Sequence, residues 1–276
     1  MKILITGASG YIGRHVVTEC LDRGHEVYVS DYSYKGLDDR AKRVEYPIFS
    51  KDKDIFFKLG SPDVLIHLAW RDGFVHNSPN HMKDLSDHVV FLNSMIDGGL
   101  KYLTVMGSMH EVGYWEGKLD ENTPCNPLSM YGIAKNALRQ ELMLYSAGKD
   151  INIHWLRAFY IYGDDAHGSS IFAKLYQANE EGKKSFPFTT GKNLYDFIEI
   201  HELAKMIVSA STQDKYNGIV NVCTGKPISL SEKIESYIKE KNMNIKLDYG
   251  AFPDRPYDSP GIWGDATVIN KIMQMN

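Results

Sequence analysis

Cysteine is scarce in this sequence of 276 residues. Its three cysteines, Cys20, Cys125 and Cys223, are far apart in the chain. An odd, widely spaced set does not form a disulfide framework and is typical of reduced thiols inside a cell. Ten histidines are present, but none belongs to an H-E-x-x-H motif and no Cys/His set has zinc-ligand spacing. The sequence therefore predicts no metal site.

Long apolar runs and a strong excess of one charge are also missing. No run approaches the roughly 18 apolar residues that a membrane-spanning helix needs, and the N-terminal MKILITGASG has neither the length nor the cleavage site of a signal peptide. A net charge of −4 argues against a surface built for nucleic-acid phosphates. The G-x-S-x-G elbow and the P-loop are absent as well. We expect a cytoplasmic protein that binds neither membranes nor nucleic acids.

What the sequence does contain is an alternation of strand and helix patterns. The apolar run at 2–6 leads through a glycine-rich turn into 14–24, which has helical spacing of apolar residues and ends at Gly24, and then into a second strand at 26–31. Further strands are expected at 63–70, 102–106 and 151–159, and helices at 81–97 and 129–147. This order predicts an α/β fold with a Rossmann-type, doubly wound parallel sheet.

The pattern changes after residue 163. Polar loops flank a helical segment at 171–181, and shorter strand patterns at 195–200 and 219–223 alternate with helical patterns at 201–211 and 229–240. We predict a Rossmann domain at 1–163 and a smaller C-terminal substrate-binding domain at 164–276, with some segments crossing back to the first.

The glycine-rich turn has the spacing G-x-x-G-x-x-G, with glycines at Gly7, Gly10 and Gly13. Glycine lets the backbone approach a pyrophosphate closely, and the helix that follows presents unpaired N–H groups. Asp31 ends the second strand, where a carboxylate accepts hydrogen bonds from an adenosine ribose and repels a 2′-phosphate. NAD is therefore the predicted cofactor, while Arg14 and Lys35 leave NADP open.

Three further residues predict catalysis. Tyr131 and Lys135 are four apart, so on a helix they point the same way, and an ammonium near a phenol lowers the pKa of the phenol. Such a tyrosine can exchange a proton with a substrate oxygen. Ser108 lies at the carboxyl end of the predicted 102–106 strand, the edge where open α/β sheets bind ligands.

At these motifs the chain resembles the extended short-chain dehydrogenase/reductases, the NAD-dependent epimerase/dehydratase family that modifies nucleotide sugars. The resemblance covers nearly the whole chain and implies that Tyr131 is the acid/base, that Lys135 holds the nicotinamide ribose and that Ser108 binds the reacting oxygen. The segments that carry it are TGASGYIG, DVLIHLAW, GSMHEVG, YGIAK, LRAFYIYG, YDFIEIHELAKMI and YNGIVNVCTGKPISLSE. The cofactor-binding residues it implies are Gly7, Gly10, Tyr11, Ile12, Gly13, Asp31, Leu68, Ala69, Tyr131 and Lys135.

Departures from the family pattern narrow the reaction. The 4,6-dehydratases have Asp-Glu directly after the catalytic hydroxyl, but here Met109 and His110 follow Ser108, and methionine cannot move protons. The 3,5-epimerase/reductases have a cysteine in this segment, and here the segment contains none. Hydride chemistry at a carbonyl remains, and His110 is either an extra acid/base, a substrate contact or a pocket-wall residue.

The substrate side departs too. Tyr160 occupies the position of a diphosphate-binding Asn, and Tyr195 that of an Arg, whereas Arg255 in DRP matches the phosphate-binding Arg of the family. The expected substrate contacts are Ser108, His110, Tyr160, Tyr195 and Arg255.

We therefore expect a nucleotide-sugar 4-ketoreductase that transfers hydride from NAD(P)H to a 4-keto-6-deoxy sugar nucleotide. The chain ends soon after DRP, which favours a reductase over the longer epimerases. The alternatives are an NAD-dependent 4-epimerase and a catalytically silent cofactor-binding regulatory protein. The resemblance also implies a homodimer through a four-helix bundle made by 81–97 and 131–147.

Overall fold

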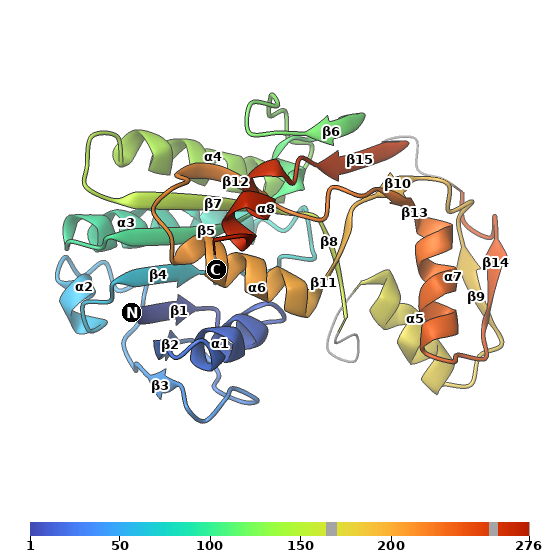
Figure 1. Cartoon of the computed structure of the whole chain (residues 1–276), viewed down its shortest axis with the longest axis horizontal. Coiled ribbons are helices and arrows are strands. Elements are labelled where there is room, and N and C mark those ends of the chain that lie inside the picture. Colours follow the sequence, from blue (N-terminus) through green and yellow to red (C-terminus); the bar gives the residue numbers. More distant parts are fainter. Residues whose placement is uncertain (164–169, 254–258, 276) are drawn as a thin grey trace.

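A seven-stranded parallel sheet forms the framework of the larger part of the molecule (Figure 1). The computed structural model describes residues 1–163, 170–253 and 259–275. The strand order is β12-β7-β5-β4-β1-β2-β3. From β1 the chain adds β2 and β3 on one side and then β4, β5, β7 and β12 on the other, and such a switch point opens a crevice at the carboxyl ends of the strands. The strands are β1 (Lys2–Thr6), β2 (Glu26–Ser30), β3 (Lys42–Arg43), β4 (Val64–His67), β5 (Tyr102–Ser108), β7 (Asn152–Ala158) and β12 (Gly218–Val222). The predicted doubly wound sheet is confirmed.

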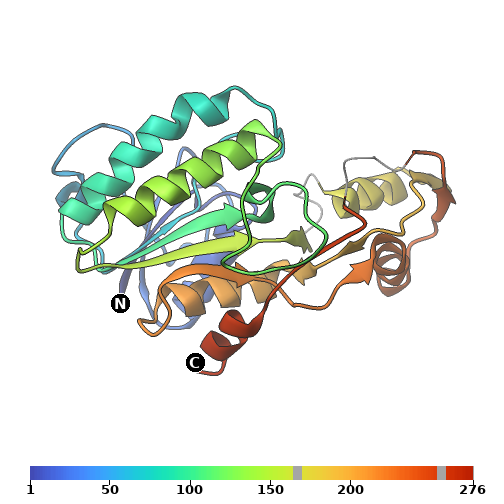
Figure 2. The ribbon, with the colours of Figure 1, turned by 90° about the horizontal axis from the view of Figure 1, so that it is seen from above.

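Helices cover both faces of this sheet (Figure 2). One face carries α3 (Asn80–Asp97) and α4 (Met130–Tyr145), which pack side by side, and the short α2 (Ile55–Lys58) packs against α3. The other face carries α1 (Gly13–Asp22), α6 (Ile200–Ser211) and α8 (Thr267–Met273). Among the described residues, no helix is long and apolar enough to cross a membrane.

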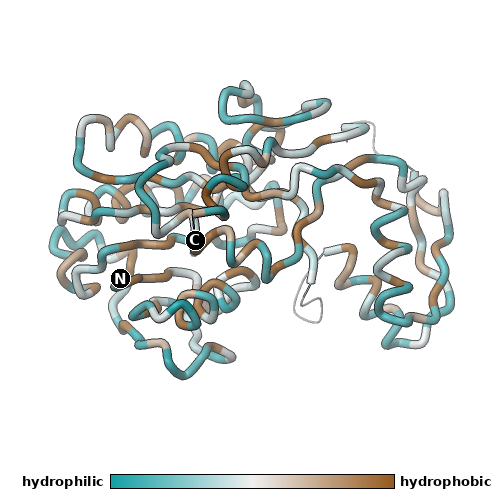
Figure 3. The backbone as a smooth tube through the Cα atoms, in the orientation of Figure 1, coloured by the Kyte–Doolittle hydropathy of each residue, from teal (hydrophilic) through white to brown (hydrophobic). Residues whose placement is uncertain are grey.

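The two helix layers explain the continuous apolar strands. Along β1, Ile3 and Ile5 belong to the core cluster that contains Val16 of α1, whereas Leu4 belongs to the cluster that contains Phe91 of α3. Successive side chains of a strand point to opposite faces, so a strand covered on both sides is apolar at every position. Figure 3 shows these apolar strands in the interior.

The chain beyond Ala158, together with the earlier strand β6, forms the smaller structures at the carboxyl edge of the sheet. They comprise α5 (Ile171–Glu180), α7 (Leu230–Glu240), the pair β9 (Ser185–Phe188) and β14 (Lys246–Tyr249), the pair β8 (Tyr160–Tyr162) and β11 (Phe197–Glu199), and a sheet of β13 (Ile228–Ser229), β10 (Leu194–Tyr195), β15 (Gly261–Gly264) and β6 (Gly117–Leu119). Between them α6, β12 and α8 return to the large sheet. A division at residue 163 with crossover segments stays a prediction.

Two expected strands have different ends. The strand expected at 63–70 stops at His67, because the chain turns out of the sheet at the switch point after Leu68 donates a last ladder hydrogen bond to Thr6. The strand expected at 102–106 continues to Ser108, because β7 pairs with it as far as Ala158. The small elements β3, α2, β6, β8, β9, β13, β14, β15 and α8 were not expected, and β9 lies in a segment expected to be a polar loop. Most of them are too short to show a periodic pattern.

Candidate active site

The glycine turn after β1 has no room for side chains. Gly7 has a φ of +70°, and a Cβ there would lie 2.5 Å from the backbone nitrogen of Ala69. A Cβ on Gly13 would lie 2.1 Å from the Gly7 carbonyl oxygen. The turn leads directly into α1, whose N-cap residue Ile12 makes no side-chain capping bond within the described chain. The turn therefore brings the N-terminal, positive end of the α1 dipole to the place where a pyrophosphate would lie.

A cavity of about 940 Å³ lies beside this turn, at the switch point. Five predicted cofactor residues line it: Gly7, Gly10, Asp31, Leu68 and Ala69. Of the other five, Ile12 and Gly13 begin α1, Tyr11 donates a 2.5 Å hydrogen bond to the Gly163 carbonyl, and Tyr131 and Lys135 lie deeper on α4.

The charge of this cavity favours NAD. Asp31 accepts hydrogen bonds from the Ser9 backbone N–H at 2.7 Å and from the Tyr32 N–H at 2.7 Å, so its carboxylate is fixed at the cavity wall. Among the described residues, three more carboxylates line the cavity, against one guanidinium from Arg71, which is paired with Asp84. A 2′-phosphate would be repelled by this excess of negative charge.

Ser108, Tyr131 and Lys135 come together at the carboxyl end of β5. Ser108 ends β5, is only 7% exposed and caps a single 3₁₀ turn, η1 (Met109–Glu111). Tyr131 lies in the first turn of α4, which begins at the N-cap Ser129, and its side chain interacts with that of Ser108. The Lys135 ammonium lies 5.9 Å from the centroid of the Tyr131 ring. The sequence motif and the strand end thus form one site.

The Lys135 ammonium makes a cation–π contact with Trp70, and no motif in the sequence indicates this contact. The Lys135 Nζ lies 3.7 Å from the centroid of the Trp70 ring and donates a 2.7 Å hydrogen bond to the Met106 carbonyl. Trp70 stacks on His88 at 4.5 Å and donates its indole N–H to His81 at 3.0 Å. Because Trp70 and His88 also line the cavity, they connect the cofactor space with Lys135.

The expectation that Lys135 lowers the pKa of Tyr131 is not met in this structure. Burial raises the pKa of Tyr131, the Glu111 carboxylate raises it further, and the interaction with the Ser108 side chain lowers it. Burial also lowers the pKa of Lys135 to about 7. Desolvation opposes the charged form of both groups, so it outweighs their mutual attraction at this distance.

Histidines surround the Tyr131 ring. His76 stacks on it with centroids 5.6 Å apart and an interplanar angle of 11°, and His81 and His110 meet it at larger angles. Burial, with a smaller effect of His76, lowers the pKa of His110 to about 4, so this ring is neutral at pH 7. His110 therefore stands beside the site as a neutral hydrogen-bonding group. The sequence analysis missed His76 and His81. The histidines in HNSPNH and GSMHEVG were the signal that could have indicated this group.

The predicted substrate residues are only partly placed. The rings of Tyr160 and Tyr195 lie 4.2 Å apart at the carboxyl edge, and Tyr195 is buried. Arg255 lies outside the described residues. Within the described part of the chain, no three Asp, Glu, His or Cys side chains are grouped as a metal-ion site.

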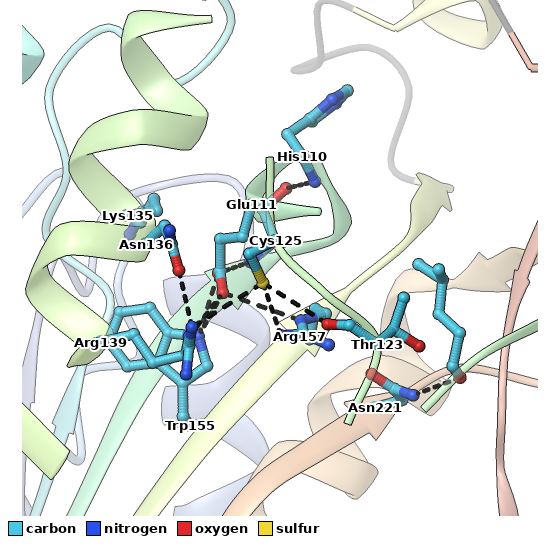
Figure 4. A network of polar contacts seen from close by, with 12 residues as sticks. His110, Glu111, Thr123, Cys125, Lys135, Asn136, Arg139, Trp155, Arg157 and Asn221 are labelled. Carbon is cyan, nitrogen blue, oxygen red and sulfur yellow. Dashed lines mark hydrogen bonds and ion pairs between the residues drawn. The ribbon is translucent and has the colours of Figure 1, made fainter. Parts of the chain in front are cut away.

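A buried polar cluster holds the backbone of Ser108. Figure 4 shows its members Glu111, Arg139, Trp155 and Arg157. Glu111 accepts the Ser108 backbone N–H at 2.6 Å and the Trp155 indole N–H at 3.0 Å. Its Oε2 faces the Nε atoms of Arg139 and Arg157 at 3.6 and 3.7 Å. Burial raises the pKa of Glu111, and Arg157 and the N–H donors oppose this shift.

Comparison with known proteins identifies the family of this chain. A family model described as "NAD dependent epimerase/dehydratase family" matches residues 3–223. The chain belongs to this family. Membership makes it an NAD-dependent enzyme rather than the catalytically silent binding protein that the sequence left open.

One similar protein spans almost the same length. It is 43% identical over 270 residues, covers 96% of this chain and 99% of its own length, and is called dTDP-6-deoxy-L-talose 4-dehydrogenase (NAD(+)), from Aggregatibacter actinomycetemcomitans.

Solved structures share the fold at low identity. A UDP-N-acetylglucosamine 4-epimerase from Methanobrevibacter ruminantium M1 aligns with a TM-score of 0.85 at 21% identity, over 98% of this chain and 91% of that one. A UDP-glucose 4-epimerase from Thermus thermophilus, in complex with NAD, aligns with a TM-score of 0.79 at 20% identity, over 98% and 92%.

The burial of Lys135 gives a prediction for how the free energy of unfolding of the protein depends on pH. Lys135→Met is expected to stabilise the protein without NAD at about pH 6. The folded-state pKa of Lys135 is about 7, below the unfolded value of about 10.4. Between these values the unfolded chain holds a proton that the folded protein has released, so the free energy of unfolding of the wild type rises with pH. The advantage of the variant should shrink by on the order of 4 kcal/mol from about pH 6 to about pH 10.

Urea denaturation at a series of pH values measures this difference. Lys83→Met is the matched control, since Lys83 is an exposed lysine of α3. An advantage of Lys135→Met that is equal at every pH would contradict the prediction.

Proposed function

We propose that the enzyme transfers hydride between NAD and C4 of a dTDP-activated 6-deoxyhexose, as a nucleotide-sugar 4-ketoreductase. The observation that carries this proposal is the 43% identity, over nearly the full length of both chains, to a protein called a dTDP-6-deoxy-L-talose 4-dehydrogenase. A 4-dehydrogenase and a 4-ketoreductase catalyse the same redox couple in opposite directions, so the name agrees with the reaction expected from Met109 and His110.

The side chains then have separate roles. The Tyr131 hydroxyl gives a proton to the C4 oxygen in the direction of reduction, or takes it in the direction of oxidation. Ser108 hydrogen-bonds to the same oxygen, and the interaction between the Tyr131 and Ser108 side chains supports this shared role. Lys135, held on Trp70, binds the nicotinamide ribose. NAD, when bound, supplies the hydride acceptor or donor.

Substrate binding and assembly extend the proposal. We assign sugar-nucleotide contacts to His110, Tyr160, Tyr195 and Arg255, and the smaller part of the chain after residue 163 to substrate binding. We also propose the homodimer through α3 and α4, because Ile133 and Leu144 expose 43% and 79% of their surface on α4 and such apolar exposure is typical of an interface. Light scattering tests the dimer.

The second candidate is a 4-epimerase, since a relative with 28% identity is a "Putative UDP-glucose 4-epimerase" from Methanocaldococcus jannaschii. An epimerase returns its hydride to the same sugar, so no cofactor is consumed. Net consumption of cofactor therefore separates the two reactions.

A cofactor-consumption assay tests the proposed function. We expect stoichiometric loss of NADH with a dTDP-4-keto-6-deoxyhexose and formation of NADH from NAD⁺ with dTDP-6-deoxy-L-talose. The negative cavity should make NADP(H) at least about 10-fold less efficient. Interconversion of C4 epimers with no net change in NADH would identify the epimerase instead, and no reaction with either sugar would refute the proposal.

A further inference from the structure

Trp70 lies between the cofactor cavity and the buried ammonium of Lys135. Its ring lines the cavity, and the Lys135 Nζ lies 3.7 Å from the ring centroid. Lys135 is only 3% exposed and donates a 2.7 Å hydrogen bond to the Met106 carbonyl. An ammonium has three N–H donors. The Met106 carbonyl and the indole face each take one direction around the nitrogen, which leaves a third donor for a ribose hydroxyl.

The indole is held in place by a hydrogen bond from its own N–H. Trp70 donates this N–H to Nδ1 of His81 at 3.0 Å, and His81 is 1% exposed. Because Nδ1 accepts, the proton of the imidazole is on Nε2, which donates to the Val75 carbonyl at 3.0 Å. This chain of two hydrogen bonds fixes the rotation of the indole in its plane.

A stack of buried rings fixes the other face of the indole. His88 stacks on Trp70 with ring centroids 4.5 Å apart and an interplanar angle of 18°. His88 shares a 2.8 Å hydrogen bond with His67, which shares one of 2.7 Å with Thr6 of β1. Burial lowers the pKa of His88 to about 3 and holds that of His67 well below its usual range. Both imidazoles are therefore neutral supports at pH 7.

The aromatic face opposes the effect of burial on Lys135. Burial lowers the pKa of Lys135 to about 7, and the Glu111 carboxylate raises it. The face of an indole attracts a cation but not a neutral amine, and in a desolvated site this favours the ammonium about 30-fold. Removal of the indole should therefore shift Lys135 towards the neutral amine, which is the weaker hydrogen-bond donor.

We propose that Trp70 is a positioning residue of this enzyme, whose indole holds Lys135 as an ammonium with one N–H directed at the nicotinamide ribose. The inference rests on the proposed role of Lys135 and adds the group that maintains it. Trp70 directly follows Leu68 and Ala69, which also line the cavity. One short segment thus shapes the cofactor space and holds the ammonium beside it.

Other titratable groups lie around Lys135, and a test must leave them unchanged. They are Tyr131 on the same helix, Glu111 of η1, His67 of β4 and His88 of α3. Variants at position 70 keep all four. A difference between such variants in the titration of Lys135 is therefore caused by the aromatic face.

NMR titration of the lysine side chains, in the protein without NAD, tests the contact itself. Lys135→Met identifies the Lys135 signal by its loss. We expect Trp70→Leu to move the midpoint of this signal to lower pH by about 1 to 1.5 pH units. Trp70→Phe keeps a smaller aromatic face and should move it less.

Trp115→Leu is the matched control for this titration. Trp115 donates its indole N–H to the Lys118 carbonyl at 3.2 Å and does not line the cavity. The midpoint of the Lys135 signal should stay at its wild-type pH in this variant. The same midpoint in Trp70→Leu and the wild type would overturn the proposal.

NADH titration, followed by the fluorescence of NADH, tests the consequence for cofactor binding. The ammonium is the binding form, so its contribution is complete below the pKa of Lys135 and is lost as the pH rises through it. The dissociation constant of Trp70→Leu should exceed that of the wild type about 4-fold at about pH 6 and about 30-fold at about pH 8. Trp70→Phe should recover part of this loss. A ratio that is the same at both pH values, or tighter binding by Trp70→Leu, would overturn the proposal.

Lys135→Met separates this inference from the proposed function. It should bind NADH at least as weakly as Trp70→Leu at about pH 8. If Lys135→Met bound NADH as the wild type does, the proposed role of Lys135 would fail and the inference with it. If Lys135→Met bound weakly while Trp70→Leu and Trp70→Phe bound as the wild type does, only the inference would fail. Circular dichroism confirms that each variant is folded, and Trp70→Phe alone makes the test if Trp70→Leu does not fold.

Discussion

Tyr131→Phe is expected to lower kcat by about 10²–10⁴-fold while leaving NAD binding within a factor of about 3. The substitution removes only the Tyr131 hydroxyl, which exchanges a proton with the reacting oxygen. The phenyl ring keeps its packing between His76 and His81, so the helix start and the position of Lys135 should persist. Steady-state rates with the sugar that proves active, and NAD titration followed by tryptophan fluorescence, measure the two quantities. Trp70 lines the cavity and reports binding directly.

Tyr145→Phe is the matched control for this variant. Tyr145 ends the same helix, and its hydroxyl hydrogen-bonds to Asp97 at 2.6 Å, away from the cavity. Its rate should stay near that of the wild type. A Tyr131→Phe enzyme with full activity would show that another group beside this ring, such as His110 with its centroid 6.2 Å away, handles the proton.

The parts of the fold and site that the sequence predicts are those with local signals. Glycine is required at positions 7 and 13 because backbone packs against backbone there. Asp31 directly follows a strand, so all three residues appear in short motifs. Tyr131 and Lys135 are one helical turn apart. Ser108 joins them because parallel strands place their carboxyl ends at one edge.

The parts that it does not predict depend on contacts between distant segments. Lys135 meets Trp70 across 65 positions of the sequence (135 − 70), and no spacing rule links them. The expected effect of Lys135 on the Tyr131 pKa was wrong for this structure for a related reason, since burial depends on what packs around both groups. Arg255 cannot be compared, because it lies outside the described residues.

Glu111→Gln is expected to destabilise the protein by about 3–5 kcal/mol, the cost of removing one partner from a buried ionic cluster. The carboxylate is fully buried and faces two guanidiniums, and Arg157 is also fully buried. A neutral amide leaves both cations without an anion from this side chain. Urea denaturation measures the loss, and a fall in melting temperature on the order of 10 °C should accompany it.

Glu121→Gln separates this effect from a general one, because Glu121 is an exposed glutamate ten positions further along the chain (121 − 111). A second comparison removes the whole cluster. The triple change Glu111→Leu, Arg139→Leu and Arg157→Met should recover much of the stability, since apolar residues of similar volume can replace buried ion pairs at little cost. Equal stability of Glu111→Gln and Glu121→Gln would contradict the ionic interpretation.

The same variants separate the stability of the cluster from its effect on catalysis. Glu111 holds the backbone of Ser108 and touches no reacting atom, so it is a positioning residue. The triple variant should therefore be stable but slow, because no acceptor fixes the Ser108 N–H and the hydroxyl is less well aligned with Tyr131. If it were both stable and fully active, the Ser108 turn would be held by the β5–β7 pairing alone, and the polar cluster would serve neither purpose.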